Sequence, residues 1–163
     1  INFWIEKPHN AENGKISFQD FGRFHEGSNT LMQSEEDIER YQILFKENKK
    51  RVVLSVPTTT LDSYCERLNV KPLFIKLDCE GAELDILRGG EKTIKKFLPT
   101  IALEMLPITI ENGKADKITN LLGGIGYSPF EIGDNFSLVP LEKFHDKQTN
   151  IVFVHRTKNR SGR

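Results

Sequence analysis

The chain has 163 residues, 37% hydrophobic and 28% charged, which is typical of one folded globular domain and excludes a disordered chain. Lys and Arg total 23, and so do Asp and Glu, so the formal net charge is zero. This balance argues against binding to nucleic acid or to an anionic membrane through overall charge. Two cysteines are too few for a disulfide framework, and no run approaches the ~18 apolar residues of a membrane span, so we expect a cytoplasmic protein with reduced thiols.

The first 50 residues differ in character from the rest. Apolar residues alternate over residues 1–6 and 15–21, and Asn13-Gly14 between them is a turn pair typical of a β-hairpin. Residues 22–50 are loop-like and then weakly helical. The chain begins at Ile1, without Met and already inside an apolar run, so we expect further residues upstream. We therefore predict a variable insertion with a β-hairpin over residues 1–50.

From residue 51 onward, strand and helix patterns alternate. The predicted strands are residues 51–56, 73–77, 100–105, 127–132 and 150–155, and the predicted helices begin at residue 60, span 80–98 with a loosening at Gly89-Gly90, and span 114–122 up to Gly123-Gly124. The nearly continuous apolar run at 73–77 is expected of a strand covered on both faces. This alternation predicts an α/β fold, with a mostly parallel sheet and helices on both faces. We expect a single, N-terminally incomplete domain over 1–163, with core elements at 51–155 and a basic tail at 156–163.

Acidic residues gather where two predicted strands end. Asp78 and Glu80 follow the strand at 73–77, and Glu104 lies at the end of the strand at 100–105. Ligands of open α/β sheets bind outside the carboxyl ends of the strands, so neighbouring strands would bring Asp78 and Glu104 together. Their mutual repulsion is one way to make a general base.

Simpler structural interpretations of the same stretch remain open. Glu80 and Glu83 share the first turn of a predicted helix, where acids are favoured, and Asp78 could cap that helix. Lys76, inside an apolar strand, would need a partner, for which Glu83 and Glu104 are the candidates.

Four segments together resemble the FkbM family of methyltransferases. They are residues 59–64 (TTLDSY), 75–83 (IKLDCEGAE), 87–90 (LRGG) and 102–104 (ALE), and the later Gly126-Tyr127 and residues 150–153 (NIVF) fit the closing strands. The resemblance covers residues 50–155 and implies a Rossmann-like fold that binds S-adenosylmethionine and methylates a hydroxyl oxygen, often on a sugar or polyketide.

The resemblance also implies roles for particular residues. Asp78 would orient or deprotonate the acceptor hydroxyl, with Glu80 as a second catalytic acid, while Glu104, Lys76 and Glu83 would surround the acceptor. The family holds its cofactor with a glycine-rich loop after the first strand and an acid after the second. Neither occurs in this chain, so the cofactor-binding residues stay unassigned and are expected upstream of Ile1.

Two other functions fit parts of the sequence. Without a cofactor loop, the chain could be a non-catalytic binding or assembly module. Alternatively, Asp78, Glu80 and Glu104 could bind Mg²⁺ or Ca²⁺ in a metal-dependent enzyme, although the four scattered histidines suggest no metal site. As partners we expect a small-molecule or glycan hydroxyl acceptor, no nucleic acid and no membrane, and an exposed sheet edge makes a homo-oligomer possible.

Overall fold

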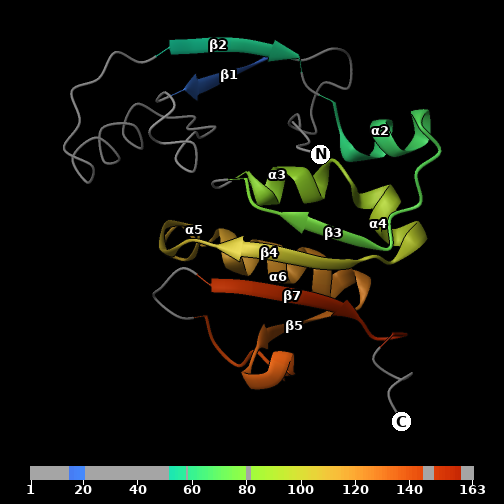
Figure 1. The fold of residues 1–163 in the computed structure, drawn as a ribbon, viewed down its shortest axis with the longest axis vertical. Helices are drawn as coiled ribbons and strands as arrows, with labels where there is room; N and C mark the ends of the chain where they lie inside the picture. Colours follow the sequence, from blue (N-terminus) through green and yellow to red (C-terminus); the bar gives the residue numbers. More distant parts are fainter. Residues whose placement is uncertain (1–14, 21–51, 58, 80–81, 145–148, 159–163) are drawn as a thin grey trace.

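The computed structural model describes residues 15–20, 52–57, 59–79, 82–144 and 149–158. The elements in chain order are β1 (Lys15–Asp20), β2 (Val52–Pro57), α2 (Leu61–Arg67), β3 (Phe74–Leu77), α3 (Glu83–Arg88), α4 (Glu91–Phe97), β4 (Thr100–Met105), α5 (Pro107–Glu111), α6 (Lys114–Ile125), β5 (Tyr127–Ile132), the 3₁₀ helix η2 (Asp134–Phe136), β6 (Leu138–Pro140) and β7 (Thr149–His155) (Figure 1). No helix in these ranges is both long and apolar enough to cross a membrane.

Five strands form the main sheet in the order β3-β4-β7-β5-β6. Only β3 and β4 are parallel neighbours, and the other three pairs are antiparallel, so the prediction of a mostly parallel sheet is wrong. The reason is the last two strands, since β6 returns antiparallel beside β5. β3, β4 and β5 run in one direction, as strand–helix alternation predicts, but β7 inserts antiparallel between β4 and β5.

The first two described strands form a separate antiparallel pair. β1 confirms a strand beginning at Lys15, and it pairs with β2 from Lys15 opposite Pro57 to Asp20 opposite Val52. The predicted strand at 51–56 is therefore present but belongs to this pair rather than to the main sheet. The predicted hairpin turn at Asn13-Gly14 and the strand before it lie outside the described residues.

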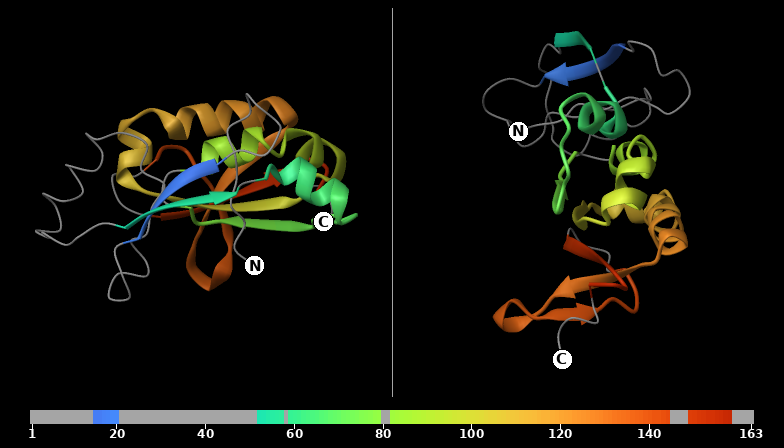
Figure 2. Two further views of the ribbon diagram at one scale, coloured as in Figure 1. Left: turned by 90° about the horizontal axis from the view of Figure 1, so that it is seen from above. Right: turned by 90° about the vertical axis from the view of Figure 1, so that its right-hand side faces the viewer.

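The larger hydrophobic core lies between the sheet and its helices. Helices α3, α4 and α6 lie on one face of the sheet, as the side views show (Figure 2). Alternate residues of β4, namely Ile101, Leu103 and Met105, are fully buried against them. Helices on both faces were predicted, but the opposite face carries a smaller cluster to which no described helix contributes. That cluster consists of Ala102, Phe130, Val152 and Val154.

The helix predicted over 80–98, with a loosening at Gly89-Gly90, is two helices, α3 and α4, and they are separated at these two glycines. Packing of α2 explains the break, because a Cβ on Gly90 would lie 2.6 Å from Cδ2 of Leu61. Asp62 in α2 also caps α4, and its carboxylate accepts hydrogen bonds from the backbone N–H of Thr93 (2.7 Å) and Lys92 (3.2 Å). A residue of α2 thus caps the beginning of α4.

The remaining boundaries follow the sequence closely. β4 and β5 occupy the predicted residues, and β7 begins one residue early, at Thr149. Helix α6 does not end at Gly123-Gly124, as predicted, but continues to Ile125. Gly126 ends it instead, because its φ of 106° is a left-handed conformation that glycine adopts readily.

Candidate active site

Three strands bring polar residues together at one end of the sheet, where β3 and β4 end and β7 begins. Asp78 directly follows β3, and Glu104 lies near the end of β4. Leu77 pairs with Leu103 in the parallel register, so Asp78 and Glu104 follow the last paired residues side by side. The predicted neighbourhood of these two strand ends is confirmed. Asn150, at the start of β7, pairs with Glu104 and adds a third polar residue to the edge.

These polar side chains lie on the sheet face opposite the helices. Leu77, Leu103 and Ile151 face the helical core. Because successive side chains in a strand point to opposite faces, the neighbours of these three residues face the other way. Those neighbours include Lys76 on β3, Glu104 on β4 and Asn150 on β7. The candidate site is therefore built on the face that carries the smaller cluster.

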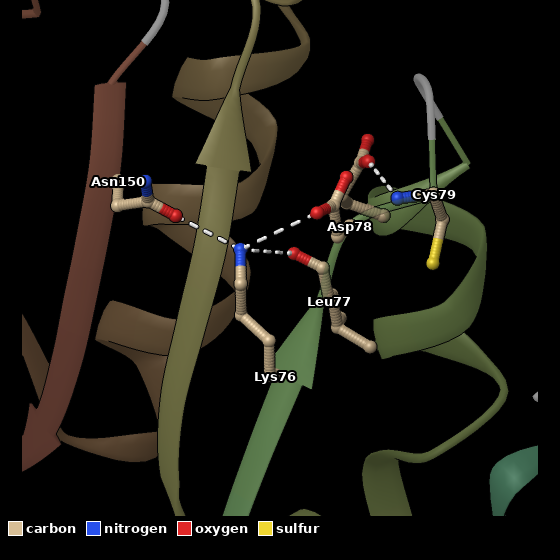
Figure 3. A network of polar contacts seen from close by, with 6 residues as sticks. Lys76, Leu77, Asp78, Cys79 and Asn150 are labelled. Carbon is tan, nitrogen blue, oxygen red and sulfur yellow. Dashed lines mark hydrogen bonds and ion pairs between the residues drawn. The ribbon is translucent and has the colours of Figure 1, made fainter. Parts of the chain in front are cut away.

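Lys76 is the centre of the polar network (Figure 3). Its Nζ donates a hydrogen bond to Oδ1 of Asn150 at 2.8 Å, lies 3.4 Å from the carbonyl oxygen of Leu77, and lies 4.0 Å from Oδ2 of Asp78. The structure thus gives Lys76 partners other than Glu83.

The environment of β3 also differs from the prediction. The strand was expected to be covered on both faces, but Phe74 is 58% exposed and the side chain of Lys76 is 42% exposed. β3 lies at the edge of the five-stranded sheet, which explains this exposure. Lys76 therefore does not require a partner for burial, and its contacts with Asn150 and Asp78 call for another explanation.

Asp78 does not cap the following helix. The N-cap position of α3 is Ala82 instead, and its side chain makes no capping hydrogen bond. The side chain of Asp78 is 53% exposed, so its carboxylate is open to solvent next to Lys76. The prediction that Asp78 caps the helix is therefore wrong. A carboxylate exposed at the end of a strand can instead bind a ligand.

Glu83 stabilises the turn that follows Asp78. Its side chain is only 1% exposed, and Oε1 accepts a hydrogen bond from the backbone N–H of Cys79 at 3.0 Å. The N–H of Ala82 donates to the carbonyl oxygen of Cys79 at 3.1 Å and closes the same turn. Burial favours a role for Glu83 in holding this turn rather than in contacting an acceptor.

Cys79 lies inside this turn with its thiol half-buried. Burial raises the pKa of the Cys79 thiol to about 11, and the nearby carboxylates of Glu83 and Asp78 act in the same direction. The thiol therefore stays protonated at neutral pH and is a poor nucleophile.

Glu80, the second predicted catalytic acid, and Gly81 lie outside the described residues. In the part of the chain that is described, no group of three or more His, Cys, Asp and Glu side chains is arranged to hold a metal ion.

Asn150 is the site residue that sequence reasoning missed. In the sequence it is only the polar start of a closing strand, and nothing there links it to Asp78, 72 positions earlier. Its place depends on the insertion of β7 beside β4. Asn150 could be placed in the site only once the strand order of the sheet was known.

Comparison with known families gives the chain its assignment. The family description "Methyltransferase FkbM domain" matches residues 8–132, which is more than half of the chain. The protein belongs to the FkbM methyltransferase family. The FkbM match includes Lys76, Asp78 and Glu104 and ends with β5, so Asn150 lies beyond it. No curated protein and no solved structure gives a significant match to this FkbM chain.

Proposed function

We propose that this FkbM domain is an S-adenosylmethionine-dependent O-methyltransferase that acts on a hydroxyl group of a small molecule or glycan. The observation that carries the proposal is Asp78, a half-exposed carboxylate at the end of a strand in a domain of a methyltransferase family. An acid at that place can hold the hydroxyl that is to be methylated.

The described residues suit the groups that react, but they include no loop of the kind that holds the nucleotide part of the cofactor. S-adenosylmethionine, when bound, supplies an electrophilic methyl group on a positively charged sulfonium. The carboxylates of Asp78 and Glu104 suit a cationic group at this edge. Among the described residues, no glycine-rich loop follows a strand, since Gly123 and Gly124 lie inside α6 and Gly126 ends it.

Asp78 would perform two tasks on the acceptor. Its carboxylate accepts a hydrogen bond from the hydroxyl and aligns a lone pair of the oxygen with the carbon to be attacked, since alignment supplies much of the acceleration in a displacement. It then receives the hydroxyl proton. An alcohol is far less acidic than a carboxylic acid, so the proton leaves only while the new C–O bond forms.

The surrounding residues would support that carboxylate. Lys76 attracts it from 4.0 Å, and Glu83 fixes the backbone immediately after it through Cys79. Glu104, level with Asn150 on the same face, would lie beside the acceptor.

Replacement of Asp78 tests the proposal. The experiment uses the longest native form of the protein, with transfer of labelled methyl from S-adenosylmethionine to a panel of monosaccharides and simple alcohols. Asp78→Asn should lower kcat by about 10²–10⁴-fold, because an amide cannot take the proton. Binding of S-adenosylhomocysteine, measured by calorimetry, should stay unchanged.

Asp116→Asn, an exposed acid on α6, is the matched control and should leave the rate unaltered. Unchanged turnover in Asp78→Asn would remove Asp78 from the mechanism. No binding of S-adenosylhomocysteine by the wild-type protein would favour the binding-module function instead.

A further inference from the structure

Lys76 reaches across a neighbouring strand to find its partner. It belongs to β3, and the residue level with it on β4 is Ala102. Asn150, which accepts its hydrogen bond at 2.8 Å, belongs to β7, on the far side of β4. In the close view the ammonium group of Lys76 lies over the β4 ribbon, between β3 and β7 (Figure 3).

Ala102 leaves room for this crossing. It is level with Lys76 on one side and with Val152 on the other, on the face opposite the helices. A methyl group is the smallest side chain that a chiral residue can offer there. Asn150 is level with Glu104, two residues further along β4, so the Lys76 side chain runs diagonally from beside Ala102 toward Glu104. We expect a branched side chain at residue 102 to crowd the beginning of this path.

The ion pair between Lys76 and Asp78 contributes little to the stability of the fold. The side chains of Lys76 and Asp78 are 42% and 53% exposed, and their charged atoms lie 4.0 Å apart. Exposed pairs of this kind contribute little to the free energy of unfolding, because water competes for both charges. The effect of fixing Lys76 is instead geometric, because a lysine with a free side chain could place its charge in many directions.

We propose that Asn150 is a positioning residue for the proposed reaction. It holds the Lys76 ammonium across β4, and the ammonium in turn directs the Asp78 carboxylate toward the acceptor hydroxyl. A neutral amide suits this task, because it binds the ammonium through one oxygen and adds no further negative charge to those of Asp78 and Glu104. The inference rests on the proposed function for its catalytic consequence but not for its geometry.

Kinetics of three variants provide the first test. Asn150→Ala removes the amide oxygen that accepts the hydrogen bond of Lys76, and Ala102→Val keeps both bonding groups but crowds the Lys76 side chain. Each should lower kcat by roughly tenfold with little change in KM, since small misplacements of a reacting group have effects of this size. Ser128→Ala, an exposed polar residue on the same face of β5, is the control and should match the wild type. Melting temperatures of the wild type, Asn150→Ala and Ser128→Ala should agree within about 2 °C.

A double variant distinguishes positioning from a general disturbance. If Asn150 acts only through Lys76, Asn150→Ala should add nothing to the loss caused by Lys76→Met. Losses that multiply would overturn the proposal, as would an unchanged kcat in Asn150→Ala. Should Ala102→Val fail to fold, the Asn150→Ala and Lys76→Met pair still decides the question.

A measurement without turnover separates this inference from the proposed function. Three-bond NMR couplings report the χ1 rotamer of Asp78 in the full chain. We expect one rotamer to be more populated in the wild type and in Ser128→Ala than in Asn150→Ala. An inactive wild type with this pattern would refute the proposed reaction but support the positioning. Identical couplings in wild type and Asn150→Ala would overturn the positioning, whatever the activity.

Discussion

Cys79 stands directly after the candidate catalytic carboxylate, where a reactive thiol would be a hazard. Both cysteines of the chain are free, as expected, and burial raises the pKa of both thiols. For Cys79 the pKa reaches about 11, compared with 9.0 for an unperturbed thiol. The turn held by Glu83 thus shields the thiol while leaving Asp78 half-exposed.

Slow alkylation of Cys79 follows from this pKa. At pH 8 the native thiolate fraction should be about a hundredfold below that of a free thiol, and iodoacetamide should react correspondingly slowly. Denaturation in urea should restore the ordinary rate. Mass spectrometry of peptides from partly alkylated protein measures both cysteines separately. Rapid native modification of Cys79 at pH 8 would show that the turn does not protect it.

At the scale of elements, α2 determines where α4 begins. Thr60 caps α2 by accepting a hydrogen bond from the N–H of Ser63 at 3.1 Å, and Asp62, two residues on, caps α4. Gly90 lets the two helices approach, because there is no Cβ to meet Leu61. These contacts divide one predicted helix into two and so set the path of the chain from β3 to β4.

Two glycine replacements should therefore change stability in opposite directions. Gly90→Ala places a Cβ 2.6 Å from Leu61 and should lower the free energy of unfolding by about 1–3 kcal/mol. Gly123→Ala, inside α6 with no atom within 4 Å of the new Cβ, should raise it by about 0.5–1 kcal/mol. Urea unfolding measures both, and equal effects of the two would contradict the packing explanation.

At the scale of the whole molecule, Tyr127 connects the helical layer to the sheet. It begins β5, and its hydroxyl donates to the carbonyl oxygen of Pro99, between α4 and β4, at 2.8 Å. Its ring meets that of His155 on β7 edge to face, with the centroids 5.2 Å apart. Burial raises the pKa of Tyr127 from 10.0 to about 12.

Alkaline pH should weaken the fold through this residue. Since the folded pKa is raised, the contribution of Tyr127 is complete below pH 10 and is lost as the pH rises toward 12. The free energy of unfolding should fall by about 2–3 kcal/mol over that range. Tyr127→Phe cannot ionise and should lack this part of the pH dependence. Chemical denaturation of both proteins at pH 8, 10 and 11.5 checks the expectation, and parallel pH profiles would contradict it.

The sequence by itself determined most of the local elements and the place of Asp78 at the end of a strand. The spacing of apolar residues and the flanking turn residues predicted β4 and β5 with the bounds that the structure shows. Each of these strands has an apolar pattern in its own sequence, which does not depend on which element packs against it. The motif around Asp78 was likewise readable, because strand, acid and helix start follow one another along the chain. Short elements such as β6 and α5 gave no such pattern and were missed.

Only the tertiary structure decided which strands are neighbours. Strand order depends on contacts between residues far apart in the chain, and β7 pairs with β4 across more than 40 positions. The place of β7 gives the sheet two of its three antiparallel pairs and brings Asn150 to Lys76. The burial of Glu83 was equally hidden, because a glutamate in a first helical turn is commonly exposed and its environment is set by packing.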